Sequence, residues 1–369
     1  MIIDCHHHVI QHWIGACGHP TGELHRKYIQ KMLTRTVART FRARDGAPAD
    51  TKALFREGDN GWSGLTDVGL RVGRFGQIEF TADGEDYYVQ YMPVGMQDYV
   101  APPELALAQM TYAGVDHCIL QAGGAYGAMS DYNAFTQNLY PEKFTGLMWV
   151  DEAMAASPEN LAEVDRAYRL GLRGIYYNVD GFARHGFAWG LDDARLEPFW
   201  AKLDELEIVL CIELSPGPSY DAAGYVAHLT QLGTVLERHP ALPCHLAMGP
   251  PVQLFGRSGR WEFPGEVAAV YRRDGLLIEV MFPITWGGVW DYPYPEAQAL
   301  IRDFRDRFGA ERMIWGSDMP NVERFCTFKQ SLDYVARYCG FLSGREKELI
   351  LGGNVARMYG IGHRGHPHA

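Results

Sequence analysis

Histidine and aspartate residues near the two ends of the sequence are the side chains best suited to metal chemistry. The run Asp4-Cys5-His6-His7-His8 ends an apolar strand candidate, and alternation along a strand would place His6 and His8 on one face with Asp4 below them. Neutral imidazole is a common ligand of Zn²⁺ and other divalent ions, so this pair could bind one cation. Far along the chain, the segment M-I-W-G-S-D-M-P (313–320) predicts a strand that presents Asp318 from a small-residue turn.

Each of these motifs taken alone also has a simpler explanation. A His-x-His pair arises by chance, although the apolar Ile2 and Ile3 before it distinguish this run from a purification tag. Asp318 could be a turn or helix N-cap carboxylate, since aspartate is common at both positions. The elements that carry the motifs decide between these readings.

Eight short apolar segments alternate with helical patterns along the chain. Repeated strand–helix units predict a parallel sheet, and eight of them predict one closed (β/α)8 TIM barrel that occupies residues 1–369 as a single α/β domain. An open doubly wound sheet is the alternative, but no GxGxxG follows the first strand and no P-loop is present. The strand candidates are 1–5, 116–121, 144–150, 174–178, 208–214, 244–247, 276–280 and 312–316.

Residues 11–99 do not follow the strand–helix rhythm and are interpreted as a long insertion after strand 1. A helical pattern covers 23–44, and the segments 77–80 and 87–91 around Asp83-Gly84 predict a β-hairpin. Active sites of barrels lie at the C-terminal ends of the strands, so an insertion leaving strand 1 is placed to be a lid. A structural cap or a subunit contact is an equally good interpretation.

Composition and charge exclude several classes of protein. The chain is 47% hydrophobic, and its 34 basic and 45 acidic side chains give a net charge of −11. Such a chain is neither disordered nor suited to nucleic acid or anionic membranes. No stretch is long and apolar enough to span a membrane, and the N-terminus does not resemble a signal peptide. Seven scattered cysteines without a CxxC pair indicate reduced thiols of a cytoplasmic protein.

Three motifs together resemble a known family. The strand ending D-C-H-H-H (4–8), the strand ending G-S-D-M-P (316–320) and the helix G-N-V-A-R-M-Y (353–359) are similar, in order and spacing, to the amidohydrolase superfamily, in its aminocarboxymuconate-semialdehyde decarboxylase-like branch. The resemblance implies a distorted barrel with one divalent metal. His6 and His8 would bind the metal, and Asp318 would bind it or accept a proton from water.

The chain departs from the family pattern on two strands. Where the family supplies a histidine at the end of strand 5, this sequence has Glu213, which is expected to bind the metal or its water and to serve in catalysis. A Glu paired with a basic residue in the barrel mouth is the alternative. The strand 6 histidine position falls on Met248, and His245 is expected to pack behind the barrel. His185, after strand 4, is a candidate replacement in catalysis.

Aromatic and cationic residues in the loops after the strands are candidates for substrate binding. Aromatic walls and a few arginines suit a planar carboxylic acid, through stacking and bidentate contacts. The candidates are Tyr177, Arg184, Arg257, Trp286 and Arg324.

The resemblance implies a metal-dependent, non-oxidative decarboxylase acting on a hydroxylated or amino-substituted aromatic or dienoic acid. A hydrolase or hydratase of a lactone or ring-fission product is the first alternative, and loss of the strand 6 histidine favours it. A non-catalytic relative that binds a small acid is the second. Zn²⁺ is the expected ion, Mn²⁺ or Fe²⁺ are alternatives because of the oxygen ligands, and some relatives work without metal. The family also makes a homodimer an expected assembly.

Overall fold

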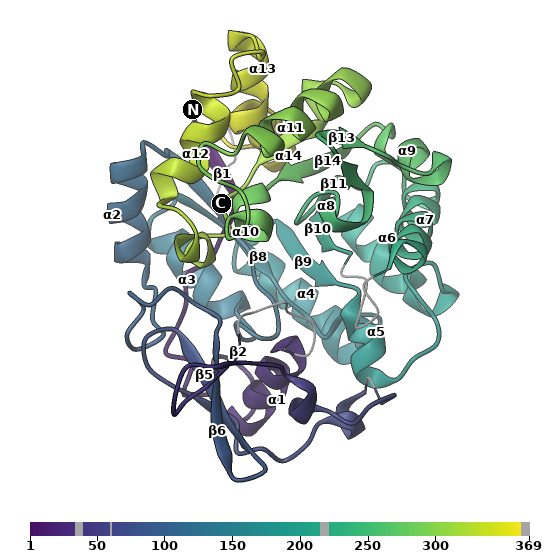
Figure 1. Cartoon of the computed structure of the whole chain (residues 1–369). Coiled ribbons are helices and arrows are strands. Elements are labelled where there is room, and N and C mark those ends of the chain that lie inside the picture. Colours follow the sequence, from purple (N-terminus) through teal and green to yellow (C-terminus); the bar gives the residue numbers. More distant parts are fainter. Residues whose placement is uncertain (34–39, 60, 215–220, 363–369) are drawn as a thin grey trace.

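A computed structural model describes residues 1–33, 40–59, 61–214 and 221–362. Its centre is a sheet of eight parallel strands that is nearly closed into a barrel (Figure 1). The two edge strands meet where the backbone N–H groups of Asp318 and His8 donate to His6 and Met319, each over 2.8 Å. The predicted TIM barrel is therefore confirmed. In spatial order the strands are β1 (Ile3–His7), β7 (His117–Leu120), β8 (Phe144–Met148), β9 (Gly174–Asn178), β10 (Val209–Glu213), β11 (Cys244–Leu246), β14 (Leu276–Val280) and β15 (Met313–Trp315).

Helices surround the barrel and connect its strands. Several begin at side chains that accept from free backbone N–H groups, such as Ser157, Asp221 and the capping boxes of Thr327 and Ser343. The main helices are α2 (Pro103–Ala113), α3 (Ser130–Leu139), α4 (Pro158–Arg169), α6 (Glu197–Glu205), α7 (Ala222–Arg238), α9 (Gly265–Tyr271), α11 (Pro295–Phe308), α12 (Phe328–Ala336), α13 (Gly344–Glu348) and α14 (Asn354–Tyr359). Shorter helices follow three strands at the mouth, namely α5 (Asp180–His185), α8 (Val252–Phe255) and α10 (Phe282–Trp286).

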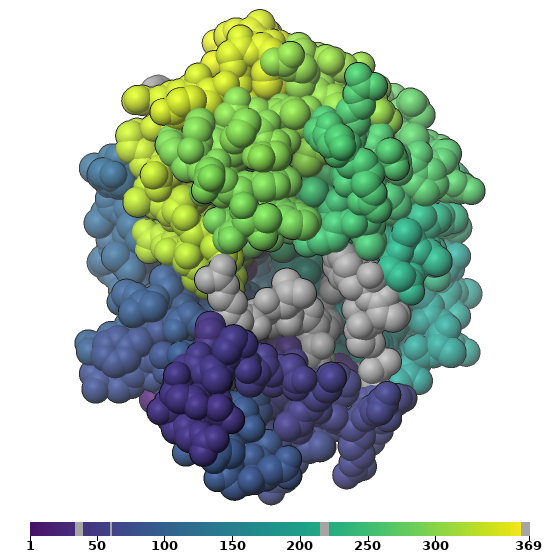
Figure 2. All heavy atoms as spheres, in the orientation of Figure 1, coloured from purple at the N-terminus to yellow at the C-terminus, as the bar shows by residue number. Residues whose placement is uncertain are grey.

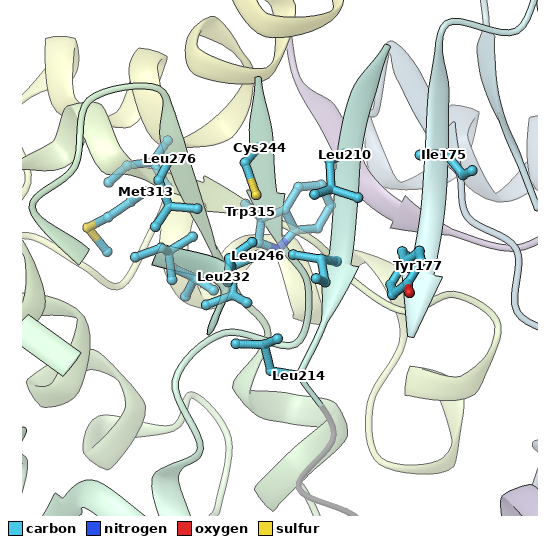
Figure 3. Packing of buried hydrophobic residues seen from close by; sticks show 14 of the residues in the cluster. Ile175, Tyr177, Leu210, Leu214, Leu232, Cys244, Leu246, Leu276, Met313 and Trp315 are labelled. Atoms are coloured by element: carbon cyan, nitrogen blue, oxygen red, sulfur yellow. The ribbon is translucent and has the colours of Figure 1, made fainter. Parts of the chain in front are cut away.

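Alternation along the strands divides the apolar side chains between two layers. Ile175 and Leu210 belong to the large outer core between barrel and helices, part of which is drawn in Figure 3. Tyr176, Cys211 and Leu277 belong to a second cluster inside the barrel. The two-residue repeat of each strand therefore determines which side chains can reach the barrel mouth.

The insertion after β1 forms a separate layer with its own core. Helix α1 (Gly22–Leu33) packs with a five-stranded antiparallel sheet, and Trp13 and Phe80 are buried between them. The predicted hairpin is present, with Asp83 and Gly84 both in the left-handed conformation that a two-residue turn requires. In order, the sheet strands are β3 (Pro48–Ala49), β2 (Thr40–Arg42), β6 (Glu85–Gln90), β5 (Gln77–Ala82) and β4 (Arg71–Val72).

The helix predicted over 23–44 is too long. Helix α1 ends at Leu33, and residues 34–39 lie outside the described residues. Thr40–Arg42 forms strand β2, which pairs with β6 and stacks Phe41 on Tyr88, with ring centroids 5.3 Å apart. Pairing with a neighbouring strand has overridden the local helical pattern.

Two further observations bear on the chain as a whole. All seven cysteines are buried and none forms a disulfide. Within the described ranges, no helix combines the length and apolar character that crossing a membrane demands.

The asparagine of the C-terminal motif, Asn354, has a structural role that can be measured. The buried Asn354 donates from Nδ2 to the carbonyl oxygens of Ala310 and Met313, each over 2.8 Å, and so fixes the start of β15. Replacing it removes two buried hydrogen bonds, although the Ala310 carbonyl keeps the backbone N–H of Met313, so Asn354→Ala should lower the free energy of unfolding by about 1–3 kcal/mol in urea titrations. Asn138→Ala, on the exposed side of α3, is the control. Equal stability of the two variants would contradict this role.

Candidate active site

Two histidines and one aspartate converge where the first and last strands of the barrel meet. His6 and His8 come from β1, and Asp318 follows β15. The two Nε2 atoms are 3.2 Å apart, and Asp318 Oδ1 lies 3.0 Å from His8 Nε2 and 3.6 Å from His6 Nε2. One ligand atom of each residue lies within 4.8 Å of the others, as a single metal ion would require.

An irregularity of β1 sets this arrangement and corrects the expected position of Asp4. The register of β1 against β7 shifts between Asp4 and His7, so Cys5 and His6 both face the interior. Asp4 points to the other side, where it accepts from His7 Nδ1 at 3.1 Å and from Ser317 Oγ at 2.6 Å. Simple alternation, which placed Asp4 below the two histidines, does not hold across the irregularity.

The far ring nitrogens of both histidines are held by hydrogen-bond acceptors. His6 Nδ1 lies 3.0 Å from the buried carboxylate of Glu279, and His8 Nδ1 lies 3.3 Å from the carbonyl oxygen of Gln121. In the tautomer that binds a metal, with the Nδ1 protons donated outward, both Nε2 lone pairs would face Asp318 Oδ1. Three polar atoms so close together need a positive charge among them, which protons supply in the metal-free chain and a divalent cation would supply in their place. The donor set therefore fits the expected metal.

The charges around the site favour an ionised aspartate and a neutral His8. Burial alone would raise the pKa of Asp318, but the hydrogen bond from His8 and the charges of both histidines lower it overall. Burial lowers the pKa of His8. Burial would also lower the pKa of His6, but the charge and hydrogen bond of Glu279 outweigh it and raise that pKa to about 9. The carboxylates thus stabilise positive charge at the site.

The site opens into a cavity of about 1220 Å³ at the barrel mouth. Loops after the barrel strands line one part of it, and the insertion lines another with residues from α1 and from the segment after β6, such as Tyr28 and Tyr91. Figure 2 shows this division, with the insertion in purple and blue below the green and yellow C-terminal half. The insertion therefore contributes to the cavity wall, while its movement as a lid stays a prediction.

Glu213 lies in the same cavity but outside the three-residue group. Its carboxylate accepts from Asn178 Nδ2 at 2.8 Å and from the hydroxyl of Tyr176, both on β9. Among the described residues the partners of Glu213 are thus neutral donors, and none is the basic residue that was the alternative. Direct binding of metal by Glu213 stays a prediction.

Three expected site residues lie away from the cavity lining. Tyr177 is on the outer face of β9, where its hydroxyl donates to the Glu152 carbonyl at 2.8 Å among the packed side chains of Figure 3. The preceding Tyr176 faces the cavity instead. Arg257 is exposed on a hairpin and donates to the carbonyl of Gly256 at 2.8 Å. His185, at the end of α5, pairs with Asp151 over 2.8 Å.

Two arginines and a tryptophan line the cavity as expected, and they differ in their ion-pair and hydrogen-bond partners. The buried Arg184 is ion-paired with Glu152. Arg324 donates from Nε to the Asn321 carbonyl at 3.2 Å, and within the described chain it forms no ion pair with a carboxylate. The Nε1 donor of Trp286 is buried at the lining without a partner. The guanidinium of Arg324 is thus available to pair with an anionic group in the cavity.

His245 is inside the barrel, which corrects the expectation that it packs behind it. Strand β11 ends at Leu246, and Met248 has a left-handed backbone with φ of 64°. Counting alternation back from Met248 therefore gave the wrong face. His245 points inward and lies 2.5 Å from Glu279, below the metal-binding group.

Four positioning residues were not predicted from the sequence. Glu279 stands alone as a charged residue in the apolar strand L-L-I-E-V (276–280), a signal that a buried partner exists. Gln121 ends β7, and Asn321 donates to Asp318 Oδ1 at 3.0 Å. Tyr126 stacks on His8 with ring centroids 4.2 Å apart, and nothing in its sequence context separates it from other loop tyrosines.

Comparison with known proteins defines the class of this barrel. The sequence model of the amidohydrolase family matches residues 3–361. The chain therefore belongs to the amidohydrolase family and is an enzyme, which confirms the family indicated by the three motifs and sets the non-catalytic alternative aside.

Individual relatives include both hydrolases and decarboxylases. L-fucono-1,5-lactonase of Burkholderia ambifaria is 27% identical over 225 residues, covering 58% of this chain and 69% of that protein. A Pseudomonas putida structure with the provisional name 2-pyrone-4,6-dicarboxylic acid hydrolase has a TM-score of 0.54 at 19% identity, covering 72% and 90% of the two chains. A manganese-bound dihydroxybenzoic acid decarboxylase of Polaromonas has a TM-score of 0.52 at 15% identity, covering 71% and 87%.

The three-residue group predicts one divalent ion per chain, measurable by plasma mass spectrometry. A chain ending at residue 362 should be used, because the tail beyond it contains histidines. His8→Ala and Asp318→Ala should each weaken binding by more than the roughly 10–100-fold that loss of an outer-shell partner costs.

The matched control for this measurement is His7→Gln. Its side chain contacts Asp4 on the other face of β1, so this variant should retain the ion. Equal metal content in His8→Ala and the wild type would place the ion elsewhere.

Proposed function

We propose that the protein hydrolyses a small cyclic ester bearing a carboxylate, with one divalent cation bound by His6, His8 and Asp318. The observation that carries the proposal is the position of the Asp318 carboxylate at the cavity, 3.0 Å from His8 Nε2, where the neighbouring histidines also lower its pKa. A base next to a cation site is the requirement for water attack on an ester carbonyl. Two nitrogen donors and one oxygen suit Zn²⁺ or Mn²⁺.

Different residues of the chain act in the successive steps of hydrolysis. A bound divalent cation would polarise the ester carbonyl and lower the pKa of water. Asp318 accepts the proton of the attacking water, and the Nδ2 group of Asn321 keeps its carboxylate oriented over 3.0 Å. The proton then passes to the ring oxygen as its bond to the carbonyl carbon breaks. The product is a hydroxy acid, heavier than the substrate by one water.

The cavity supports an anionic and flat substrate. Arg324 offers a guanidinium without a carboxylate partner among the described residues, and it lies with its charged group 5.6 Å from the ring of Tyr91. Tyr126, Tyr176 and Trp286 add further aromatic surface to the lining. The net charge of −11 opposes the approach of an anion, so a local positive charge such as that of Arg324 would be required to attract it.

The residues at the end of β11 favour hydrolysis over decarboxylation. Non-oxidative decarboxylation needs a group that protonates the ring carbon, and the family places a histidine here. The residues of this segment that line the cavity run from Leu246 to Pro251, and none of their side chains can transfer a proton. The curated relative, a lactonase, also supports hydrolysis.

Decarboxylation of a hydroxylated aromatic acid is the second candidate. The observation in its favour is the hydrogen bond between Tyr176 and Glu213 at the cavity, since this pair could donate a proton to a ring carbon. The aromatic lining also suits such an acid. Solved structures named as decarboxylases of this type share the fold.

The product distinguishes the two reactions. Purified enzyme should be tested with L-fucono-1,5-lactone, 2-pyrone-4,6-dicarboxylate and 2,6-dihydroxybenzoate, with CO₂ release and product mass both measured. We expect a gain of one water without CO₂, and Asp318→Asn should slow turnover by about 10²–10⁴-fold, as loss of a general base does.

Release of CO₂ without added water would overturn the proposal in favour of decarboxylation. Glu213→Gln then gives an independent check, because it should abolish a decarboxylase that depends on this carboxyl group. A hydrolase that uses Asp318 should lose much less activity in the same variant.

Arg324 should determine affinity for the substrate carboxylate. Arg324→Gln removes a charge-assisted hydrogen bond of about 1.5–3 kcal/mol, which corresponds to an increase in KM of about 10–100-fold with a smaller change in kcat. Arg257→Gln is the matched control, because that arginine is exposed and outside the cavity lining. Equal KM values for both variants would remove Arg324 from substrate binding.

A further inference from the structure

The interior of the barrel holds a second polar layer directly below the metal-binding group. Its centre is Glu279 on β14, which has no exposed surface. Leu277 on the same strand also faces inward, whereas Ile278 and Val280 belong to the outer core. A buried carboxylate in such a place is costly unless several donors surround it.

Four donors saturate the two oxygens of Glu279. Oε2 accepts from His6 Nδ1 at 3.0 Å and from the Met248 backbone N–H at 2.8 Å. Oε1 accepts from Gln121 Nε2 at 2.9 Å and from His245 Nε2 at 2.5 Å. These donors come from three strands or their ends, β1, β7 and β11, so the carboxylate on β14 is fixed relative to a large part of the barrel.

Gln121 connects the two histidines of the metal-binding group. Its side-chain amide donates to Glu279, which holds His6, and to the Cys5 carbonyl at 3.0 Å. Its backbone carbonyl accepts from His8 Nδ1. One residue therefore influences the ring orientation of both histidines, through its side chain for one and its backbone for the other.

We infer that Glu279 and Gln121 are positioning residues that set the affinity of the His6–His8–Asp318 group for a divalent cation. They keep the proton of each ring on Nδ1 and both Nε2 lone pairs directed at one point. They touch neither the cavity nor any substrate bound in it, since Glu279 and Gln121 are absent from its described lining. The inference rests on the metal site of the proposed function and goes beyond it in naming what holds that site together.

The isosteric variant Glu279→Gln tests this inference. An amide cannot accept from all four donors, so the His6 ring loses its fixed orientation and tautomer. Binding of Mn²⁺, followed by the electron paramagnetic resonance of the free ion, should weaken by about 10–100-fold, the usual effect of losing an outer-shell carboxylate. The nitrogen-15 shifts of labelled histidine should also show Nδ1 of His6 no longer uniformly protonated.

Glu152→Gln is the matched control. Glu152 is an equally buried carboxylate, but it pairs with Arg184 and contacts neither metal-binding histidine. The Glu152→Gln variant should bind Mn²⁺ as tightly as the wild type, even if Glu152→Gln and Glu279→Gln both lower the stability of the fold.

Other outcomes separate the inference from the proposed function. Wild-type affinity in Glu279→Gln, with binding still lost in His8→Ala, would overturn the inference while the metal site stands. No Mn²⁺ or Zn²⁺ binding by the wild type would overturn both. If Glu279→Gln does not fold, Gln121→Met removes the amide that donates to Glu279 and to the Cys5 carbonyl, and it keeps the backbone carbonyl that holds His8. Weaker Mn²⁺ binding by this variant would support the inference, and unchanged binding would overturn it.

Discussion

Convergence of two imidazole nitrogens and one carboxylate oxygen is the constraint on which the rest of this site depends. Atoms that all carry lone pairs repel one another, so the arrangement persists only with a positive charge among them and with each ring held from behind. The barrel supplies this support by closing β1 against the segment after β15, through the backbone bonds of Asp318 and His8. Closure of the sheet and assembly of the site are therefore the same event.

Backbone irregularity is used at the points where side chains must be aimed. The register shift of β1 turns His6 inward next to Cys5, and Asp318 has a left-handed φ of 58°. Both positions are more costly than regular strand, and such deviations concentrate at functional sites. The buried network around Asp4 and Ser317, on the other face of β1, anchors the same two segments to each other. One strand thus carries the candidate metal ligands on one face and an anchoring network on the other.

The sequence was sufficient to predict the barrel and the proximity of His6, His8 and Asp318, because both depend on strong local patterns. The eight apolar strands, the H-x-H run and the strand that ends at Asp318 are each legible without a structure. Side-chain direction was predictable only while strands stayed regular. Asp4 and His245 were assigned to the wrong face because alternation was counted across the β1 irregularity and across the end of β11. Tyr177 was chosen where its neighbour Tyr176 faces the cavity, since both residues suit an aromatic wall equally well.

What the sequence could not reveal is the network that crosses between strands. Glu279 looked like an isolated charge in an apolar strand, and its meaning depends on His6, Gln121 and His245, which are far apart in the chain. The same holds for the cavity, because its wall combines barrel loops with an insertion that folds around its own core.

Glu213, Glu279 and Asp318 lie close together in this acidic chain, so their negative charges would repel one another without nearby donors. Here Glu279 is neutralised by donors inside the barrel, Asp318 by the histidines, and Glu213 is held by two neutral donors. Arg324 lines the cavity without a carboxylate partner among the described residues, so its charge is available to attract an anionic substrate.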